Sequence, residues 1–266
     1  MAVYRNDNAL DFATAVHSIY TKQTVKPSEI IIVIDGPIPQ TLEMTLSELK
    51  RQIDVIRFVR FEKNRGHSAV RQAGLDAATN EFIAVMDADD ISEPDRFEKQ
   101  LGAYDKNTDV AVIGGQIKEF IDTNDNVVGE RIVPIDDTDI KRYLKSRCPM
   151  NLVTVMYRKS AVESVGGFMD WYCEEDYYLW IRLAEAGYKF ANLPDNLVNV
   201  RVGKEMYQRR GGWKYFKSEA QLQRYMLSHR IISLPRYCYN TLGRFVIQIA
   251  MPNKLRGFVF QKLFRK

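Results

Sequence analysis

Acidic side chains are missing from the end of this 266-residue chain, because no Asp or Glu follows Glu219. The same segment, 220–266, holds nine Lys or Arg, whereas residues 1–219 carry 34 acidic against 29 basic side chains. The overall charge of +4 therefore combines an acidic-leaning body of net charge −5 with a basic tail. No nucleic-acid recognition motif accompanies the basic tail, and we expect no nucleic-acid partner.

Cysteines are few, and long apolar runs are absent. Cys148, Cys173 and Cys238 are odd in number and widely spaced, which supports neither a zinc site nor a disulfide framework and suits a reducing cytoplasm. The longest apolar run, 245–251, is interrupted by Gln248 and falls far short of the roughly 20 residues that span a bilayer. We therefore expect a cytoplasmic protein without a membrane-spanning helix.

The sequence lacks a recognisable signal peptide and the common glycine-rich nucleotide-binding motifs. The first eight residues have neither the basic leader nor the apolar stretch of a signal peptide. Met-Ala-Val-Tyr resembles the end of a strand whose beginning is missing, as a start site assigned too late would leave it. The absence of G-x-G-x-x-G weakens a dinucleotide-binding fold, and the absence of G-x-x-x-x-G-K-[ST] excludes a P-loop.

Strands and helices alternate through the first hundred residues, which predicts βαβ units and a parallel α/β sheet. β-branched runs are typical of strands buried on both faces, and apolar residues at helical spacing indicate the helices between them. After about residue 105 the pattern predicts an antiparallel or mixed region. The expected N-terminal elements are a helix at 9–22, a strand at 29–34, a helix at 40–52, a strand at 55–61, a helix after 66, a strand at 82–86 and a helix beginning at 93–94.

Polar residues follow three of the expected strands. Asp35 follows the strand expected at 29–34, residues 64–66 follow the strand at 55–61, and residues 87–90 follow the strand at 82–86. In open α/β sheets, ligands bind beyond the carboxyl ends of the strands. The three segments therefore predict one binding site at this edge of the sheet.

Asp87-Ala88-Asp89 forms a D-x-D pattern at the predicted edge. Carboxylates clustered on a tight turn can hold Mg²⁺ or Mn²⁺, hard cations that prefer oxygen ligands and often bridge to substrate phosphates. The alternative is that Asp90 caps the next helix while the other two acids are solvated. The position directly after a buried strand favours the metal site.

A loop and a second acidic cluster add further candidates. Asn64, Gly66 and Arg71 surround a helix start, where backbone amides and a guanidinium suit a phosphate or a nucleobase. Residues 174–176 are Glu-Glu-Asp before an aromatic helix, and three acids exceed what helix capping needs. A carboxylate there can be the general base that a hydroxyl nucleophile requires.

Four stretches of the sequence resemble, in order, the motifs of family 2 glycosyltransferases with the GT-A fold. They are 3–37, 62–78, 81–100 and 166–190, and Asp-Gly-Pro at 35–37 is similar to the subgroup of bacterial exopolysaccharide and O-antigen synthesis. The resemblance implies an α/β fold with a mixed, mainly parallel central sheet flanked by helices, and a C-terminal helical extension. It also implies inverting transfer of a sugar from a nucleotide-sugar to an acceptor hydroxyl.

The resemblance assigns roles to individual residues. Asp176 would be the catalytic base with Glu175 as a donor- or acceptor-binding neighbour, and Asp89 would hold Mg²⁺ or Mn²⁺ on the donor diphosphate. Asp87 would contact the ribose and Asp35 the base. The full set implied for the nucleotide-sugar pocket is Val3, Tyr4, Arg5, Asp35, Asn64, Gly66, Arg71, Asp87 and Ala88.

Two features depart from the family pattern. Residues 34–36 contain one acid where most members have two, which leaves the nucleotide open, with a UDP-sugar favoured over dTDP- or GDP-linked donors. The Gln-x-x-Arg-Trp motif of processive synthases is absent, and residues 208–213 match it only loosely. We therefore expect single additions rather than polymerisation.

The resemblance also suggests how the chain is divided. Residues 1–203 would form the catalytic domain, with a nucleotide-binding half at 1–105 and an acceptor-binding half at 106–203, and 204–266 would form a basic, amphipathic helical extension. The acceptor would be a lipid-linked glycan of O-antigen, capsule or exopolysaccharide synthesis. The extension suits an anionic lipid surface, here the inner face of a bacterial cytoplasmic membrane, and the alternative is a helical pair packed on the core.

Two other functions stay open at this point. A sugar nucleotidyltransferase also combines an α/β fold with an acidic metal site, although the second acidic cluster beside a Gly-Gly loop argues against it. A non-catalytic, sugar-nucleotide-binding scaffold would share the same binding residues.

Overall fold

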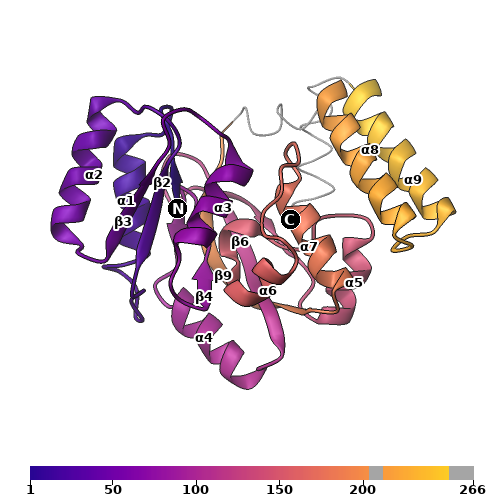
Figure 1. The fold of residues 1–266 in the computed structure, drawn as a ribbon, viewed down its shortest axis with the longest axis horizontal. Helices are drawn as coiled ribbons and strands as arrows, with labels where there is room; N and C mark the ends of the chain where they lie inside the picture. The colour runs from indigo at the N-terminus through magenta and orange to yellow at the C-terminus, as the bar shows by residue number, and fades with distance from the viewer. Residues whose placement is uncertain (204–211, 252–266) are drawn as a thin grey trace.

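The structure, a computed structural model that describes residues 1–203 and 212–251, contains two β-sheets flanked by helices (Figure 1). The first sheet is parallel and has the order β1-β2-β3. Its strands are β1 (Ala2–Val3), β2 (Ile30–Ile34) and β3 (Ile56–Arg60), and the accompanying helices are α1 (Ala9–Ser18), α2 (Gln40–Gln52) and α3 (His67–Ala77).

The second sheet is mixed and has the order β4-β8-β6-β9-β5, with β7 paired to β6. Only β6 and β9 pair in parallel within it. Its strands are β4 (Phe82–Ala84), β5 (Ile91–Ser92), β6 (Val110–Phe120), β7 (Val127–Arg131), β8 (Met156–Arg158) and β9 (Lys189–Arg201). The helices around it are α4 (Arg96–Lys106), α5 (Asp137–Leu144), the 3₁₀ turn Leu152–Thr154, α6 (Lys159–Ser164) and α7 (Glu175–Glu185).

The predicted alternation of strands and helices is confirmed up to β3, and the mixed region is confirmed after it. The predicted strand at 82–86 forms only over Phe82–Ala84. It pairs antiparallel with β8 rather than extending the parallel series. The parallel sheet therefore ends one strand earlier than the sequence pattern predicts.

The helix predicted to begin at 93–94 is present as α4, but it begins at Arg96. Ile91–Ser92 forms a short strand, β5, which pairs with β9 and was not predicted. Asp90 consequently caps no helix, because its carboxylate accepts the backbone N–H of Arg201 at 2.9 Å. A strand pairing across more than one hundred residues leaves no trace in the local pattern.

Two helices, α8 (Trp213–Ser228) and α9 (Leu234–Phe245), lie side by side at one end of the molecule, followed by a π-helical turn at Val246–Ala250 (Figure 1). Leu222, Met226 and Ile232 are buried in the same apolar cluster as Trp180 of α7. The helical pair thus packs on the core, as one of the two alternatives for the tail predicted. Of the loose motif match at 208–213, only residues 212 and 213 are among the described residues. The last fifteen residues of the tail, 252–266, lie outside them.

Candidate active site

Asp35 organises the loop that follows β3. Its carboxylate accepts hydrogen bonds from Asn64 Nδ2 at 2.8 Å and from the backbone N–H groups of Arg65 at 2.6 Å and Gly66 at 3.0 Å. Gly36 allows this close approach, since a Cβ at that position would lie 2.7 Å from the Asn64 nitrogen. The structure therefore brings Asp35, Asn64 and Gly66 together at the carboxyl edge of the parallel sheet, and their contacts with a nucleotide stay a prediction.

The turn after β4 places its carboxylates in two environments. Asp87 and Asp89 are exposed, whereas Asp90 is buried. Arg96 lies fully buried nearby and donates to the Val85 carbonyl at 2.9 Å. Burial lowers the pKa of Arg96 to about 9, and the charges of Asp87 and Asp90 oppose this shift. Arg96 therefore stays cationic at neutral pH, and from its buried position it offsets part of the negative charge of Asp87 and Asp90.

Arg201, at the end of β9, holds the same turn from the second half of the chain. Its Nε donates to the Asp89 carbonyl at 3.2 Å, its backbone N–H binds the Asp90 carboxylate, and its guanidinium pairs with Asp11 of α1 at 2.8 Å. Sequence reasoning missed both Arg96 and Arg201, because each reaches the turn through tertiary packing rather than through a local motif.

Asp7 is a third carboxylate beside Asp87 and Asp89 that sequence reasoning missed. Its Oδ2 accepts the Tyr4 N–H at 2.8 Å. Burial above all, with the charges of Asp89 and Asp87, raises the pKa of Asp7 to about 6, and the hydrogen bond from the Tyr4 N–H opposes this shift. Asp89 is exposed as a residue, but partial desolvation of its carboxyl group and then the charge of Asp87 raise its pKa as well. The three carboxylates therefore lie close enough to disfavour each other's ionised form.

This donor set fits a Mg²⁺ or Mn²⁺ ion. A divalent cation favours the ionised form of Asp7, Asp87 and Asp89 and would relieve their mutual repulsion. Within residues 1–203 and 212–251, no three His, Cys, Asp or Glu side chains enclose a metal ion by themselves. Mg²⁺ is often bound through one or two carboxylates together with substrate phosphates and water, so a site completed by a diphosphate suits this edge.

The remaining residues predicted for the pocket lie at the same edge or beside it. The backbone carbonyl of Val3 accepts the Asp35 N–H at 2.8 Å, so β1 ends next to β2 at the site. Val3 is buried, Tyr4 is half-buried and Arg5 is exposed. Ala88 is buried in the acidic turn. That these residues line a nucleotide pocket stays a prediction.

The second acidic cluster occupies the start of α7. Glu174 and Glu175 are buried, and Asp176 is half-buried. Asp176 accepts the Tyr177 N–H at 2.7 Å and has the Cys148 Sγ at 3.8 Å. Burial raises the pKa of Asp176 above its ordinary value, and the charge of Glu175 raises it further. A raised pKa moves a carboxylate toward the range in which a general base works well.

Arg71 connects the two regions of the candidate site. Its guanidinium forms an ion pair with Glu175, and the two side chains are only 16% and 9% exposed. Arg71 belongs to α3, which follows directly on Gly66, the residue bound to the Asp35 carboxylate. One helix therefore runs from the loop at the sheet edge to the acids at the start of α7. The sequence spacing did not predict this contact.

The fold is that of the GT-A class of glycosyltransferases. The profile of the family described as "Glycosyl transferase family 2" matches residues 2–166, and the chain belongs to this family.

Two curated relatives match over nearly the whole chain. The chain is 33% identical over 264 residues to the amylovoran biosynthesis glycosyltransferase AmsE of Erwinia amylovora, with 98% of this chain and 97% of that protein covered. It is 32% identical over 267 residues to the UDP-Gal:alpha-D-GlcNAc-diphosphoundecaprenol beta-1,3-galactosyltransferase of Escherichia coli, covering 100% of this chain and 95% of the relative. The predicted resemblance to exopolysaccharide and O-antigen glycosyltransferases is confirmed.

Solved structures share the fold at low sequence identity. S. aureus TarS 1–349 in complex with UDP-GlcNAc superposes with a TM-score of 0.65 at 16% identity, over 92% of this chain and 72% of that one. The mannosyltransferase PcManGT of Pyrobaculum calidifontis, in complex with GDP-Man and Mn²⁺, gives 0.61 at 15% identity, over 96% and 70% of the two chains. The predicted GT-A fold class is confirmed.

Proposed function

We propose that this chain is an inverting glycosyltransferase that moves a sugar from a nucleotide-sugar, favoured to be UDP-linked, to a hydroxyl of a lipid-linked oligosaccharide. The process would be the synthesis of a bacterial surface polysaccharide. The proposal rests on the family membership and on one observation. Arg71 ties the acids at the start of α7, Asp176 among them, to the helix that begins at the Asp35 loop.

Asp176 is proposed as the base that takes the proton from the attacking hydroxyl. Its Oδ2 is only weakly engaged, with a thiol at 3.8 Å as its described partner, which leaves it able to accept a proton. Glu175 is held by Arg71 and is therefore proposed to position Asp176 and the substrates rather than to take the proton itself.

The other half of the reaction is the departure of a nucleoside diphosphate. A divalent ion bound at Asp89, with Asp87 and Asp7 beside it, would stabilise the charge that develops on this leaving group. Asp35, Asn64 and Gly66 would hold the nucleotide at the sheet edge. The UDP-linked donor is supported by the E. coli galactosyltransferase, whose donor is UDP-Gal, and by the UDP-GlcNAc complex of TarS.

The proposal is tested with a panel of UDP-, dTDP- and GDP-linked sugars in the presence of Mg²⁺ or Mn²⁺. At least one UDP-sugar is expected to raise the unfolding temperature, since a ligand at about 100 times its Kd stabilises a protein by about 2.7 kcal/mol. The metal-dependent part of this shift should fall strongly in Asp89→Asn. Differential scanning fluorimetry measures both effects without requiring the acceptor.

Asp54→Asn is the matched control for that experiment. Asp54 is an exposed acid that precedes β3, at the opposite edge of the parallel sheet, so its loss should leave the shift unchanged. A protein that no nucleotide-sugar stabilises would contradict the proposed function. Stabilisation without sugar transfer to a lipid-linked acceptor would favour the scaffold instead.

The surface of the C-terminal helices supports a membrane partner. In α9 and the turn after it, Tyr239, Leu242 and Val246 are 74%, 65% and 46% exposed, and their spacing places them along one face of the helix. Arg236 on α9 and Arg224 on α8 are exposed, and this basic, apolar combination suits anionic lipid. Within the described residues, no helix combines the length and hydropathy of a membrane span. We therefore propose peripheral binding at the inner face of the cytoplasmic membrane.

Substitution of the exposed face of α9 should weaken this binding. The variant Tyr239→Asp/Leu242→Asp is expected to lose about tenfold or more of its partition onto phosphatidylglycerol vesicles, because each apolar side chain contributes about 1.5 kcal/mol or more when buried. The control Leu10→Asp/Met44→Asp changes two equally exposed apolar residues of α1 and α2. Equal co-sedimentation of both variants would contradict membrane binding through α9.

The division into a catalytic domain at 1–203 and an extension at 204–266 stays a proposal. Two hydrogen bonds join α8 to the segment before α7. Ser218 Oγ donates to the Tyr172 carbonyl at 2.6 Å, and Trp171 Nε1 donates to the Ser218 carbonyl at 3.2 Å. One of the extension's 14 basic residues, Arg244, is paired with Glu219 at 2.9 Å and is not available to lipid.

A further inference from the structure

Helix α9 turns polar side chains inward as well as apolar side chains outward. Tyr239 and Leu242 are 74% and 65% exposed, whereas Asn240 is buried and the Arg244 side chain is only 13% exposed. Burying an arginine is unfavourable unless charged and polar partners compensate for the lost water. The contacts of Asn240 and Arg244 therefore indicate what the inner face of α9 holds in place.

Arg244 and Asn240 bind the backbone of the segment that follows α5. Arg244 Nη2 donates to the Ser146 carbonyl at 2.7 Å, and Arg244 Nε lies 2.9 Å from the Glu219 carboxylate of α8. One turn earlier on α9, Asn240 Nδ2 donates to the Lys145 carbonyl at 2.9 Å. Two neighbouring side chains of one helix thus hold two consecutive carbonyls, while Glu219 orients the guanidinium.

The segment 144–148 in turn contacts the start of α7. The Tyr177 hydroxyl donates to the Leu144 carbonyl, and Cys148 Sγ lies 3.8 Å from Asp176 Oδ2. The segment is therefore bound by α9 on one side and touches the proposed base and its neighbour on the other. A displacement of its backbone would reach Asp176 through the Cys148 side chain.

Arg244 also places a positive charge beside the acids at the start of α7. Burial and then the charges of Glu219 and Asp176 raise the pKa of Glu174 well above its ordinary value. A hydrogen bond with Tyr215 and the charge of Arg244 oppose this shift. Arg244 thus reduces the repulsion between Glu174 and Glu219, which would otherwise act on the first turn of α7.

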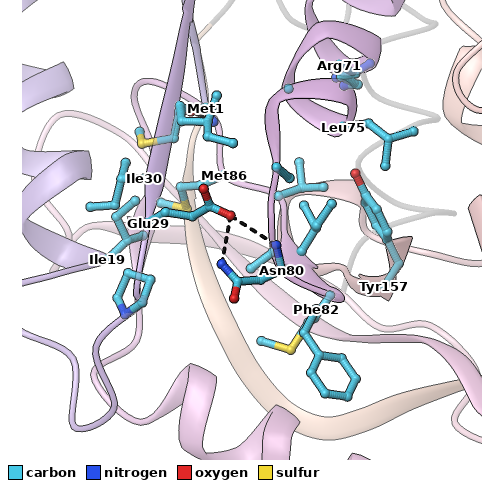
Figure 2. A pocket seen from close by; sticks show the side chains of 18 of the residues that line it. Met1, Ile19, Glu29, Ile30, Arg71, Leu75, Asn80, Phe82, Met86 and Tyr157 are labelled. Atoms are coloured by element: carbon cyan, nitrogen blue, oxygen red, sulfur yellow. Dashed lines mark hydrogen bonds between the residues drawn. The ribbon is translucent and has the colours of Figure 1, made fainter. Parts of the chain in front are cut away.

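The start of α7 is held by two arginines from different helices. Figure 1 places α7 between α3 on one side and the α8–α9 pair on the other. Figure 2 shows Arg71 on α3, at the upper rim of an apolar pocket and one turn before Leu75, and its ion pair with Glu175 reaches α7 from that side. Arg244 reaches the same region from α9.

We propose that Arg244 is a positioning residue for the proposed base. Together with Asn240 it fixes the backbone of residues 145–146, and through Cys148 it fixes the orientation of the Asp176 carboxylate. The inference rests on the proposed function, in which Asp176 is the base. Arg244 acts through another side chain and not on a substrate, so its loss should lower the turnover number and leave the KM of the donor unchanged.

The first test measures sugar transfer to a lipid-linked acceptor dispersed in detergent, so that membrane binding does not limit the rate. Arg244→Met is expected to lower the turnover number about 10–100-fold, the effect of a small misplacement of a reacting group. Arg244→Lys keeps the charge but lacks the planar fork that serves Glu219 and Ser146 at once, so its rate should be intermediate. The control Arg230→Met changes an exposed arginine between α8 and α9 and should match the wild type.

The double variant Arg244→Met/Glu219→Gln separates positioning from stability. Arg244→Met leaves the Glu219 carboxylate without its cation, so we expect its unfolding temperature to fall by about 3–6 °C. The second substitution removes the uncompensated charge and should restore most of this loss. The turnover number of the double variant should nevertheless stay low, because α9 no longer holds the Ser146 carbonyl.

Thiol labelling tests the same inference without an activity assay. In a Cys173→Ser/Cys238→Ser background, Cys148 is the only cysteine of the chain, and it is half-buried. Adding Arg244→Met/Glu219→Gln should increase the rate of its reaction with 5,5′-dithiobis(2-nitrobenzoate) about threefold or more, because the loosened segment opens more often. Adding Arg230→Met should leave the labelling rate unchanged.

The outcomes distinguish this inference from the proposed function. Sugar transfer by the wild type, with an unchanged turnover number in Arg244→Met, would overturn the role of Arg244 and leave the proposed function intact. Full recovery of the turnover number in the double variant would assign the loss to charge balance and would also overturn the inference. A wild-type chain that transfers no sugar to any acceptor would contradict the proposed function itself.

Discussion

Asp176→Asn should lower the turnover number for sugar transfer by about 10²–10⁴, the range typical of the loss of a general base. The substitution keeps the size of the side chain and its hydrogen bond from the Tyr177 N–H, but it removes the group that accepts the acceptor proton. Donor binding should persist, because the nucleotide is proposed to bind at the Asp35 edge. Initial rates with a lipid-linked acceptor and thermal shift with the donor separate the two effects.

Asp139→Asn is the matched control for this experiment. Asp139 also lies in the first turn of a helix, α5, where it is exposed and paired with Arg142, so its loss changes a helix start without touching the site. Both the Asp139 variant and the wild type should transfer sugar at similar rates. If Asp176→Asn kept more than a tenth of the wild-type rate, the proposed base would have to be another group.

Separating Arg71 from Glu175 should produce the largest loss of stability. Removing one partner of a buried ion pair leaves an uncompensated charge and costs about 3–5 kcal/mol. The side chains are 16% and 9% exposed, so we expect about 3 kcal/mol for Arg71→Met, or an unfolding temperature lower by about 6–12 °C. The double variant Arg71→Met/Glu175→Gln should recover part of this loss, and a double-mutant cycle measures the coupling.

The exposed pair of Arg60 with Glu43 provides the control cycle. It has two hydrogen bonds, of 2.7 and 2.8 Å, but its side chains are 50% and 40% exposed. Exposed pairs contribute about 1 kcal/mol or less, so Arg60→Met should change the unfolding temperature little. Similar losses for Arg60→Met and Arg71→Met would mean that the Arg71 pair does not connect the two halves of the site.

The single substitutions Arg71→Met and Glu175→Gln should shift the acid limb of the pH–rate profile in opposite directions. Arg71 lowers the pKa of Asp176, and Glu175 raises it. A general base is active when deprotonated, so activity falls as pH drops through this pKa. The acid limb is therefore expected at higher pH in Arg71→Met and at lower pH in Glu175→Gln, a pattern that a purely structural role for the pair would not produce.

The sequence predicted those parts of the site that lie next to one another along the chain. Asp35 and 64–66 each follow a β-branched strand, and the carboxyl ends of parallel strands meet at one edge of a sheet. Their contact is therefore a consequence of strand order, and it is present. The acids at 87–90 and 174–176 were equally visible as clusters in the sequence, although their roles stay predictions.

Sequence reasoning failed where a contact depends on packing between distant segments. Asp90 accepts the backbone N–H of Arg201, 111 residues away, and the neighbouring residues 91–92 pair with β9 in a strand that the sequence pattern did not predict. Arg96 was not singled out because a buried arginine has no periodic or motif signature. Asp7 lies near Asp87 and Asp89 only because the fold brings the segment after β1 close to the turn after β4.

The sequence by itself determined the family, the order of the elements and the two acidic clusters, because these depend on side-chain period and local turn chemistry. Tertiary structure alone decided what surrounds the acids. It placed Arg96 and Arg201 against the first cluster, and it joined Arg71 to Glu175 in the second. The physical reason is that charge and burial act through space, so the environment of a carboxylate follows from the segments packed around it and not from its neighbours in the chain.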